Sequence, residues 1–340
     1  MKRLFLLMFA LGCLVVAKAD NDVQIAVLQS GENVKVFKGP NALTNAHEEA
    51  VDGDVITLSE GSFNACNITK SVSIYGAGYE ENKTNGTLLT QINSIVTVGL
   101  QDKTLSNVHL EGLYLSGGLN VGGGINDYPL ANLRVVKSKI NYIYSNSTNS
   151  NTSFDQCVIL GQMNADNNTL LVADLYFRNC IMPQSAFQNY RNTNSHMTID
   201  HCIVGAIYPS GYNPFRNSHP GLLTLTNSIY VRSGNSGSVG FPSDSFVKNC
   251  ISDQSNVVNY TNCFYVDKAL IFKDGENADY SPTRTYELQQ PTVWVDDKGN
   301  QIGIRGGNGW SKVPSTPVVK NLSVTPSGTN LNVTYEAEVR

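Results

Sequence analysis

Hydrophobic and polar residues recur along the middle of the chain with a period of about 22 residues. The pattern is clearest when seven segments are aligned on a small residue, Cys or Ser, which we call position 0. Every segment has an apolar residue at position −3, and six of the seven have one at position +1. The aligned small residues are Ser138, Cys157, Cys180, Cys202, Ser228, Cys250 and Cys263.

Position −1 holds Asn in four of the seven segments, and His201 stands there in a fifth. Asn and His are among the residues that tolerate the left-handed backbone of a tight corner. Each repeat is therefore predicted to form a strand, a corner and a second strand. A β unit this short cannot bury its own hydrophobic face, so successive units must stack. The apolar sites are mixed Ile, Val, Phe and Tyr, which favours a parallel β-helix over a leucine-rich repeat.

Residues 40–79 read PNALTNAHEEAVDGDVITLSEGSFNACNITKSVSIYGAGY. This stretch resembles the start of the right-handed parallel β-helix proteins of the pectate-lyase-like superfold, found among secreted proteins of polysaccharide-degrading bacteria. The match includes Gly53-Asp54, the run Ile68-Thr69-Lys70, and Gly76 and Gly78. The repeated Asn corners resemble that family's asparagine ladder, and 302–310 resembles the place where such helices end.

The resemblance implies an all-β fold, a single-stranded right-handed parallel β-helix (solenoid), over residues 20–310. A capping α-helix is expected near 40–51, where Ala42, Leu43, Ala46 and Ala50 also fall near helical spacing. Residues 311–340 differ in pattern. They predict two alternating strands around a Pro-Ser-Gly-Thr-Asn turn, which would form a C-terminal β cap or a small β appendage.

Residues 1–19 predict a secretory signal peptide, because Lys2 and Arg3 are followed by an apolar run and an Ala-Lys-Ala cleavage site. A lipoprotein signal ending at Cys13 is the alternative. The apolar run is shorter than the ~20 residues of a membrane span. We therefore expect an exported protein, periplasmic, cell-surface or extracellular, with no membrane span and as a monomer.

The composition and net charge of the chain indicate which classes of binding partner to expect. Charged residues make up 15% of the chain and the net charge is −4. Nucleic-acid binding, which calls for a basic patch, is not expected. The chain has 38 Asn and 29 Gly, which suits a backbone that turns often.

Six cysteines follow the signal peptide: Cys66, Cys157, Cys180, Cys202, Cys250 and Cys263. Five of them share position 0 with two serines, so the position selects for a small side chain. Stacked cysteines would point the same way in parallel, which opposes disulfide geometry. We expect free, stacked thiols and no metal site, since no Cys-x-x-Cys occurs.

Position −2 should face outward if position −3 faces inward. Asp155, Arg178 and Asp200 would then form an acid–base–acid ladder on consecutive coils, flanked by Tyr176 at position −4. These three residues are the catalytic candidates. The alternative is an exposed charge ladder, in which such pairs contribute about 0.2–1 kcal/mol each.

Two long loops, 188–196 and 208–220, offer aromatic and cationic side chains. Aromatic rings suit sugars, and Arg suits uronate carboxylates; packing of the loops onto the coil is the other interpretation. With Tyr176, the ligand-binding candidates are Tyr190, Arg191, Tyr208, Tyr212 and Arg216.

The stretch Asp200-His201-Cys202 places three reactive side chains in succession. Because the chain alternates and then bends, we expect these side chains not to converge.

Three functions stay open. The first is an exported, non-catalytic protein that binds polysaccharide. The second is a polysaccharide lyase or glycosidase acting along the outer sheet face on an acidic glycan; we expect no resident cofactor, although a lyase would use Ca²⁺. The third is a structural or adhesive surface protein. The catalytic motifs of the superfold's enzymes are not evident in the sequence.

Overall fold

The computed structural model describes residues 24–82, 87–101, 103–122, 128–145, 147–165, 172–182, 187, 189–190, 192–205, 221–231, 241, 244–275, 284–315, 318–327 and 330–338. The predicted signal peptide lies outside these residues.

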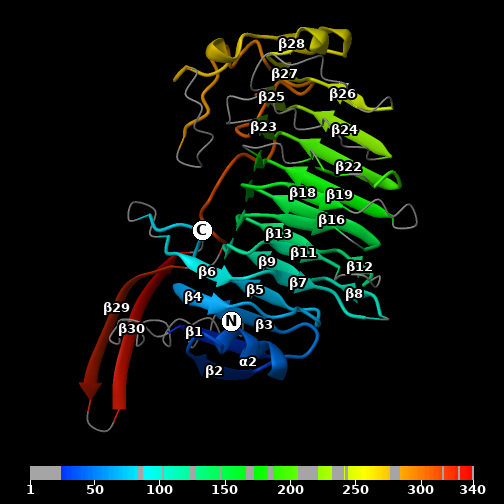
Figure 1. The fold of residues 1–340 in the computed structure, drawn as a ribbon. Coiled ribbons are helices and arrows are strands. Elements are labelled where there is room, and N and C mark those ends of the chain that lie inside the picture. Colours follow the sequence, from blue (N-terminus) through cyan, green and yellow to red (C-terminus); the bar gives the residue numbers. More distant parts are fainter. Residues whose placement is uncertain are drawn as a thin grey trace.

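Most of the described chain winds into a parallel β-solenoid, whose coils stack along one axis (Figure 1). Three sheets run along it, which confirms the predicted parallel β-helix.

The first sheet contains β1 (Ile25–Ser30), β2 (Asn33–Lys38), β3 (Val55–Leu58), β5 (Ser73–Tyr75), β8 (Leu105–Ser106), β9 (His109–Glu111), β12 (Leu130–Ala131), β13 (Arg134–Val136), β16 (Asn149–Asp155), β19 (Ala173–Arg178), β22 (Ser195–Asp200), β24 (Leu222–Thr226) and β26 (Phe246–Lys248). The second contains β4 (Gly61–Asn64), β6 (Thr90–Asn93), β10 (Tyr114–Leu115), β14 (Lys139–Ile140), β17 (Val158–Ile159), β20 (Ile181–Met182), β23 (Ile203–Gly205), β25 (Ile229–Val231), β27 (Ile251–Ser252) and β28 (Phe264–Tyr265). The third contains β7 (Val96–Val98), β11 (Leu119–Val121), β15 (Ile143–Ser145), β18 (Met163–Ala165) and β21 (Asn189–Tyr190).

The coil interior is filled by columns of like side chains. Position −3 supplies one column, in which the rings of Phe154 and Phe177 stack with centroids 5.0 Å apart. Position 0 supplies another, and Cys157, Cys180 and Cys202 are fully buried in the same core. Register between coils therefore brings equivalent residues into direct contact.

The corners adopt the left-handed backbone that the sequence predicts. All seven residues at position −1 have φ between 45° and 56°. Their side chains also bond from coil to coil: Asn249 Nδ2 donates to Asn227 Oδ1 at 2.9 Å, and Asn262 Nδ2 donates to Asn249 Oδ1 at 2.7 Å. This confirms the asparagine ladder.

A second asparagine ladder runs along the opposite end of the first sheet's strands, where the cysteine-based alignment does not reach. Asn107, Asn132 and Asn151 have φ of 58°, 58° and 54°. Asn132 Nδ2 donates to Asn107 Oδ1 at 3.1 Å, and Asn151 Nδ2 donates to Asn132 Oδ1 at 2.8 Å. Two corners of the coil are thus held by the same chemistry.

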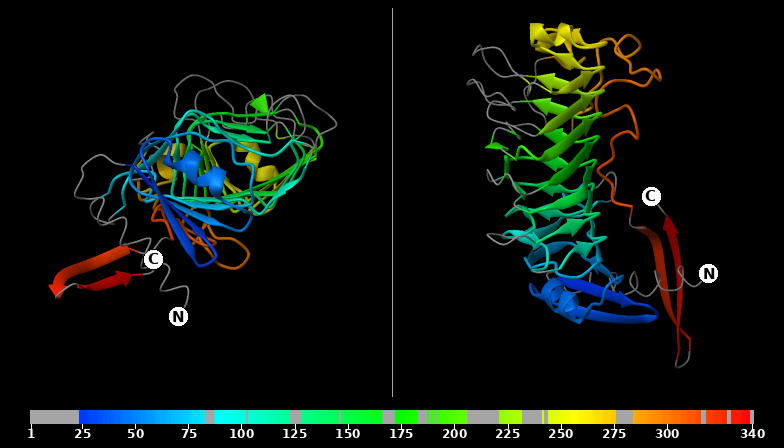
Figure 2. Two further views of the ribbon diagram at one scale, coloured as in Figure 1. Left: turned by 90° about the horizontal axis from the view of Figure 1, so that it is seen from below. Right: turned by 90° about the vertical axis from the view of Figure 1, so that its right-hand side faces the viewer.

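Position +1 points away from the coil interior because position 0 points into it. Its residues Ile181, Ile203 and Ile229 are nevertheless buried, in a second apolar cluster that includes Trp294 and Ile302. The cover is residues 284–315, which we call the return segment. After β28 the chain runs back along the outside of the coils (Figures 1 and 2).

The return segment corrects the expected boundary of the solenoid. Among the described residues the last coil strand is β28, and residues 302–310 do not mark the solenoid's end. They lie against its middle, where Gly303 N donates to Asn227 O at 2.8 Å. Asn179 Nδ2 donates to the carbonyls of Ile304 and Gly306 at 3.0 and 2.8 Å. The apolar residues at position +1 are covered by the return segment. Alignment of the repeats could not predict this cover, because the return segment is not one of the repeats.

The N-terminal end is closed by α2 (Ala42–Glu49), as predicted. Ala42, Leu43 and Ala46 are fully buried against the first coils. The hairpin β1–β2, which the sequence analysis missed, joins the first sheet antiparallel to β3. Helix and hairpin together cover strand groups that would otherwise pair with another chain.

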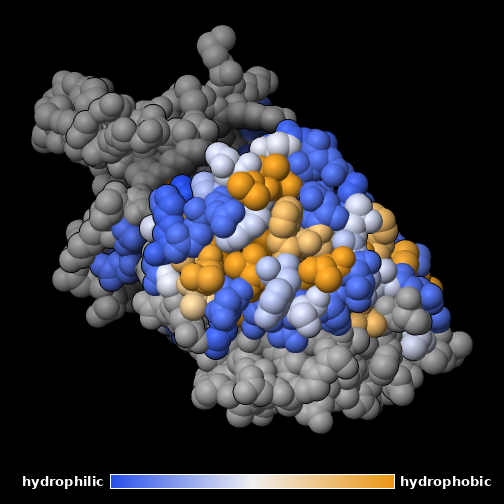
Figure 3. Space-filling model, turned by 90° about the horizontal axis from the view of Figure 1, so that it is seen from above, coloured by the Kyte–Doolittle hydropathy of each residue, from blue (hydrophilic) through white to orange (hydrophobic). Residues whose placement is uncertain are grey.

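The far end carries the 3₁₀ helices η2 (Ser255–Asn259) and η3 (Lys268–Leu270). Val257 of η2 is buried, whereas Val258 and Leu270 are exposed. Seen from this end, apolar side chains gather over the middle of the face, with polar ones around them (Figure 3).

The C-terminal residues form the predicted pair of strands, β29 (Val318–Ser327) and β30 (Asn330–Glu338), paired antiparallel. Among the described strands they pair only with each other. The hairpin lies outside the coils, near the end that α2 closes (Figure 2).

All six cysteines among the described residues are free, as expected. Four are buried in the core, and Cys66 and Cys263 are partly exposed. Burial raises the pKa of the Cys66 thiol to about 12. A hydrogen bond with Cys250 instead lowers the pKa of Cys263.

We predict that the corner backbone, and not only the ladder, stabilises the coil. Asn249→Gly loses the ladder bonds, about 1 kcal/mol each, but keeps free access to the left-handed region. Asn249→Ala should lose a further 1–2 kcal/mol or so, because a Cβ disfavours that region. Urea denaturation measures the difference, with Ser62→Ala, at an exposed strand position, as control. Equal midpoints for the Gly and Ala variants would contradict this account.

We predict that Cys263 reacts first with a thiol reagent in the native protein, because it alone combines exposure with a lowered pKa. The other thiols should react only on unfolding, giving six in total for residues 20–340. Cys263→Ser should abolish the early reaction. A denatured count below six would show that bridges form.

Candidate functional site

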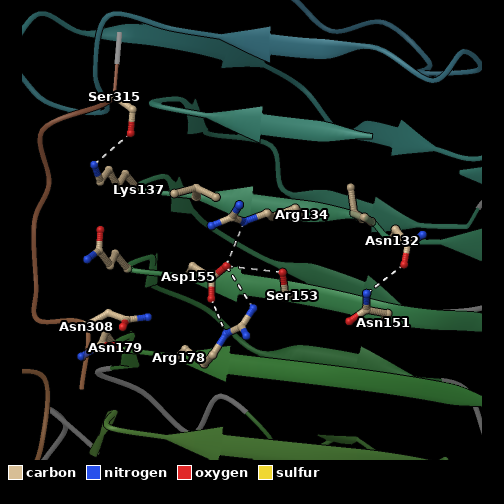
Figure 4. A pocket seen from close by; sticks show the side chains of 13 residues that line it. Asn132, Arg134, Lys137, Asn151, Ser153, Asp155, Arg178, Asn179, Asn308 and Ser315 are labelled. Carbon is tan, nitrogen blue, oxygen red and sulfur yellow. Dashed lines mark hydrogen bonds and ion pairs between the residues drawn. The ribbon is translucent and has the colours of Figure 1, made fainter. Parts of the chain in front are cut away.

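The outer face of the first sheet is hollowed where the return segment passes beside it. A hollow of about 640 Å³ lies over β13, β16 and β19. A smaller one of about 250 Å³ adjoins it, sharing Arg178, Asn179 and Asn308. We call the two hollows together the sheet groove; Figure 4 shows the side chains that line the larger one.

The strand register places the predicted ladder in this groove. Asp155 pairs with Arg178 across β16 and β19, and Arg178 pairs with Asp200 across β19 and β22. Tyr176, two residues before Arg178, lies on the same face and is half-buried. The three catalytic candidates therefore stand on consecutive coils, as alternation along a strand predicts.

Arg178 engages only one of the two carboxylates in these contacts. Its Nε and a terminal nitrogen donate to Asp155 at 2.6 and 3.2 Å. Arg134, on the preceding coil, donates its Nε to the same carboxylate at 3.2 Å. Asp155 is thus held between two guanidinium groups (Figure 4).

Asp200 has different partners. Thr226 Oγ1 and Asn227 Nδ2 each donate to its Oδ1 at 2.7 Å. Its Oδ2 lies 2.9 Å from His201 Nδ1. Burial raises the pKa of Asp200, but these hydrogen bonds outweigh it and hold the pKa below its ordinary value.

Asp200, His201 and Cys202 do not meet at one point, as expected, but the expectation is wrong for Asp200 and His201, which contact each other. The left-handed corner at His201 turns its ring back over Asp200. Cys202 alone turns away, into the core. Side chains point alternately to the two faces along a strand. This rule fails at the corner, because the left-handed backbone of His201 changes the direction of the chain.

His201 is buried beneath the return segment, with 6% of its side chain exposed. Its Nε2 lies 3.8 Å from Asp296 Oδ2. Gly306 and Gly307 pack on the ring so closely that a Cβ on Gly307 would lie 2.9 Å from Nδ1. The return segment thus packs on the His201 ring, which Asp200 holds, and Asp296 approaches Nε2 without a hydrogen bond. We call this packing the clamp; the return segment forms one wall of the sheet groove.

Of the remaining ligand candidates, the structure describes only Tyr190. Tyr190 is fully buried in the core, so a ligand outside the coil does not reach its ring. Arg191, Tyr208, Tyr212 and Arg216 lie outside the described residues.

Sequence reasoning missed Arg134 and Lys137. Arg134 occupies position −4, the column that contains Tyr176, and this column was the available signal. Lys137 is a corner residue whose Nζ donates to Ser315 Oγ of the return segment at 3.2 Å. That contact depends on a segment 178 residues away in the sequence.

The larger hollow is locally basic. It is lined by three cationic side chains, Arg134, Lys137 and Arg178, and one carboxylate, Asp155, which sum to +2. The whole chain has a net charge of −4. Arg134 and Arg178 are half-exposed, so an anion can reach them from solvent.

Within the described ranges, no cluster of three or more His, Cys, Asp or Glu side chains fits a metal ion. In the same ranges, no helix is long and apolar enough to cross a membrane.

Comparison of the chain with protein-family models, with curated proteins and with solved structures gave no match. The side chains of the sheet groove are therefore the basis for assigning a function.

We predict that acid releases the return segment. The pKa of Asp296 is lowered like that of Asp200, because hydrogen bonds from Asn300 and Lys298 outweigh its desolvation. Carboxylates with lowered pKa values stabilise the fold above their unfolded pKa, about 3.9, and this contribution is lost as pH falls through the folded value. The chain's two tryptophans, Trp294 and Trp310, both lie in the return segment and report its release by fluorescence.

Asp200→Asn should move this fluorescence transition to milder denaturant at neutral pH. Asp174→Asn, in an exposed pair with His196 on the same sheet, is the control and should not. An unchanged tryptophan transition in Asp200→Asn would exclude the clamp.

Proposed function

We propose that this protein binds an acidic polysaccharide at the larger, basic hollow of the sheet groove, acting as an exported protein outside the cytoplasm. The observation that carries the proposal is the arrangement of Arg134 and Arg178 around Asp155, in a groove open to solvent.

Asp155 supports the two guanidinium groups. It fixes their side chains on the sheet surface without exhausting their donors, because Arg134 bonds it through Nε alone. The terminal nitrogens of Arg134 have no other partner among the described residues and can bind a uronate carboxylate or a sulfate in forked geometry. An anchored Arg also loses less side-chain entropy on binding.

The shape of the groove favours a polymer. It crosses several strands and is open along its length, with amide side chains that can donate to and accept from sugar hydroxyls. The lining amides are Asn132, Asn151, Asn179 and Asn308. Tyr176, half-buried two residues before Arg178 on the same face, is an aromatic side chain near this surface.

Binding fits the ladder better than catalysis does. Asp155 accepts from two arginines, and Asp200 accepts from Thr226 and Asn227 and contacts His201. Carboxylates so engaged hold the surface in place. We therefore assign Asp155, Arg178 and Asp200 to the architecture of the binding surface and the clamp.

We predict that titration calorimetry detects binding to uronate oligosaccharides and none to neutral ones of equal length. Arg134→Ala and Arg178→Ala should each weaken binding about tenfold or more, because a hydrogen bond to a charged group contributes about 1.5–3 kcal/mol. Added salt should weaken binding as well.

Lys35→Ala is the matched control, since it removes a cation at the N-terminal end, paired with Glu49. Equal affinity for neutral glycans, or full affinity in both Arg variants, would overturn the proposal. Failure to bind any glycan would favour a structural or adhesive protein.

A further inference from the structure

The two ends of the solenoid are closed to different degrees. At the N-terminal end, α2 and the hairpin β1–β2 cover the first coils, and the outer strand β2 carries the exposed residues Lys35 and Lys38. Charged residues, Lys above all, keep other chains from adding to the edge of a sheet. The far end has only the short 3₁₀ helices η2 and η3, and among the described strands β28 pairs with β27 alone. One edge of β28 is therefore open.

The far end also leaves apolar side chains in contact with solvent. Val258 of η2, Tyr265 of β28 and Leu270 of η3 are 59%, 56% and 60% exposed. Apolar side chains gather over the middle of this face (Figure 3). β28 itself contains neither Lys nor Pro, the residues that block the addition of a strand. An apolar surface beside an open strand edge is where a strand of another chain can add to a sheet.

The C-terminal hairpin has the complementary properties. Apolar residues of β29 are register partners of apolar residues of β30: Leu322 with Tyr335, Val324 with Val333, and Pro326 with Leu331. The positions between these pairs are polar. Because successive residues of a strand alternate between its faces, the apolar residues share one face of the hairpin. A two-stranded hairpin with such a face is at best marginally stable on its own in water.

The two strands of the hairpin differ in how their outer edges are protected. β29 contains Lys320 and Pro326, both of which oppose the addition of a further strand. β30, with the sequence NLNVTYEAE, contains neither Lys nor Pro. The edge of β30 is therefore the one open to a partner strand.

The position of the hairpin separates it from the far end of its own chain. Just before the hairpin, the return segment is anchored beside the early coils: Ser315 N donates to Glu111 at 2.6 Å, and Lys312 forms an ion pair with Glu80. The hairpin then runs away from the far end, toward the end that α2 closes (Figures 1 and 2). In this arrangement the hairpin and the far end meet only between two copies of the chain.

The charges of the two surfaces are compatible. β30 ends in the acidic sequence Glu-Ala-Glu, residues 336–338. At the far end, Lys268 and Lys273 are exposed on either side of Leu270. The carboxylates of the same stretch, Asp267 and Asp274, already accept hydrogen bonds within their own chain. Opposite charges therefore face each other when β30 lies on this end.

We propose that this protein assembles head to tail, with the C-terminal hairpin of one copy docked on the far end of the next and β30 added to the open edge of β28. The apolar face of the hairpin then covers the surface around Val258 and Leu270, and the hairpin gains the neighbouring strand that it lacks. The contact joins two different surfaces, so it repeats into a filament unless it closes into a ring. The assembly does not depend on glycan binding, and it replaces the monomer expected from the sequence.

The test measures the mass of the chain from residue 20 to residue 340 by light scattering over a range of concentrations, with electron microscopy of the largest species. The native protein should rise in mass with concentration to more than two copies. Leu270→Asp at the far end and Val333→Asp in β30 should each stay monomeric where the native protein assembles, because a charge is buried in the contact. Ile95→Asp, at an exposed apolar residue before β7, is the control and should assemble normally.

An equimolar mixture of the two variants separates this contact from every symmetric one. Each variant keeps the surface that the other has lost, so the mixture should form pairs of copies and nothing larger. The same pairing shows that both variants are folded.

Native protein that stays monomeric at every concentration would overturn the inference. Self-association of Leu270→Asp would also overturn it, because the hairpins would then be pairing with each other. Self-association of Val333→Asp would do the same by showing that two far ends meet. A mixture that stays monomeric, although the tryptophan fluorescence of both variants is native, would count against it equally.

Discussion

The left-handed corner at position −1 is the constraint on which the rest of this structure depends. Seven residues with φ near 50° turn the chain at the same point of successive coils. Because the turn recurs in register, residues at position −3 always meet in the core and residues at position −2 always meet outside. The phenylalanine stack and the charged column across Asp155 and Arg178 are two results of the same geometry.

The return segment converts this repetitive scaffold into an asymmetric surface. One sheet gains an apolar cover over its position +1 residues. The neighbouring sheet gains a wall, secured at His201 and at Glu111, that turns an exposed charge ladder into a groove. The three carboxylates of this face have different partners. Asp155 accepts hydrogen bonds from Arg134 and Arg178, Asp200 contacts His201, and Glu111 contacts His109.

Sequence patterns predicted the features that depend on local spacing within the repeats. They did not predict contacts between segments that are distant in the sequence. The columns through Phe177 and Cys180, the Asn corners and the cap helix all follow from local spacing, and each is present. The pairing of Asp200 with His201 did not follow, because alternation was carried through a corner that breaks it. Arg134 and His109 occupy equivalent positions on neighbouring strands, so an alignment of position −4 could have found them. The contacts of Lys137 and Glu111 with Ser315 had no local signal, since they join segments 178 and 204 residues apart.

The return segment also bears on how this protein can evolve and fold. A solenoid usually gains or loses repeats freely, because each coil contacts only its neighbours. Here Lys312, close to the C-terminal hairpin, forms an ion pair with Glu80, 232 residues earlier, so the segment spans a fixed number of coils. Adding a coil would pull its anchors out of register with His201 and Glu111. The return segment thus fixes the number of coils between its anchors. Its docking follows the formation of those coils, because contacts between distant parts of the chain form late.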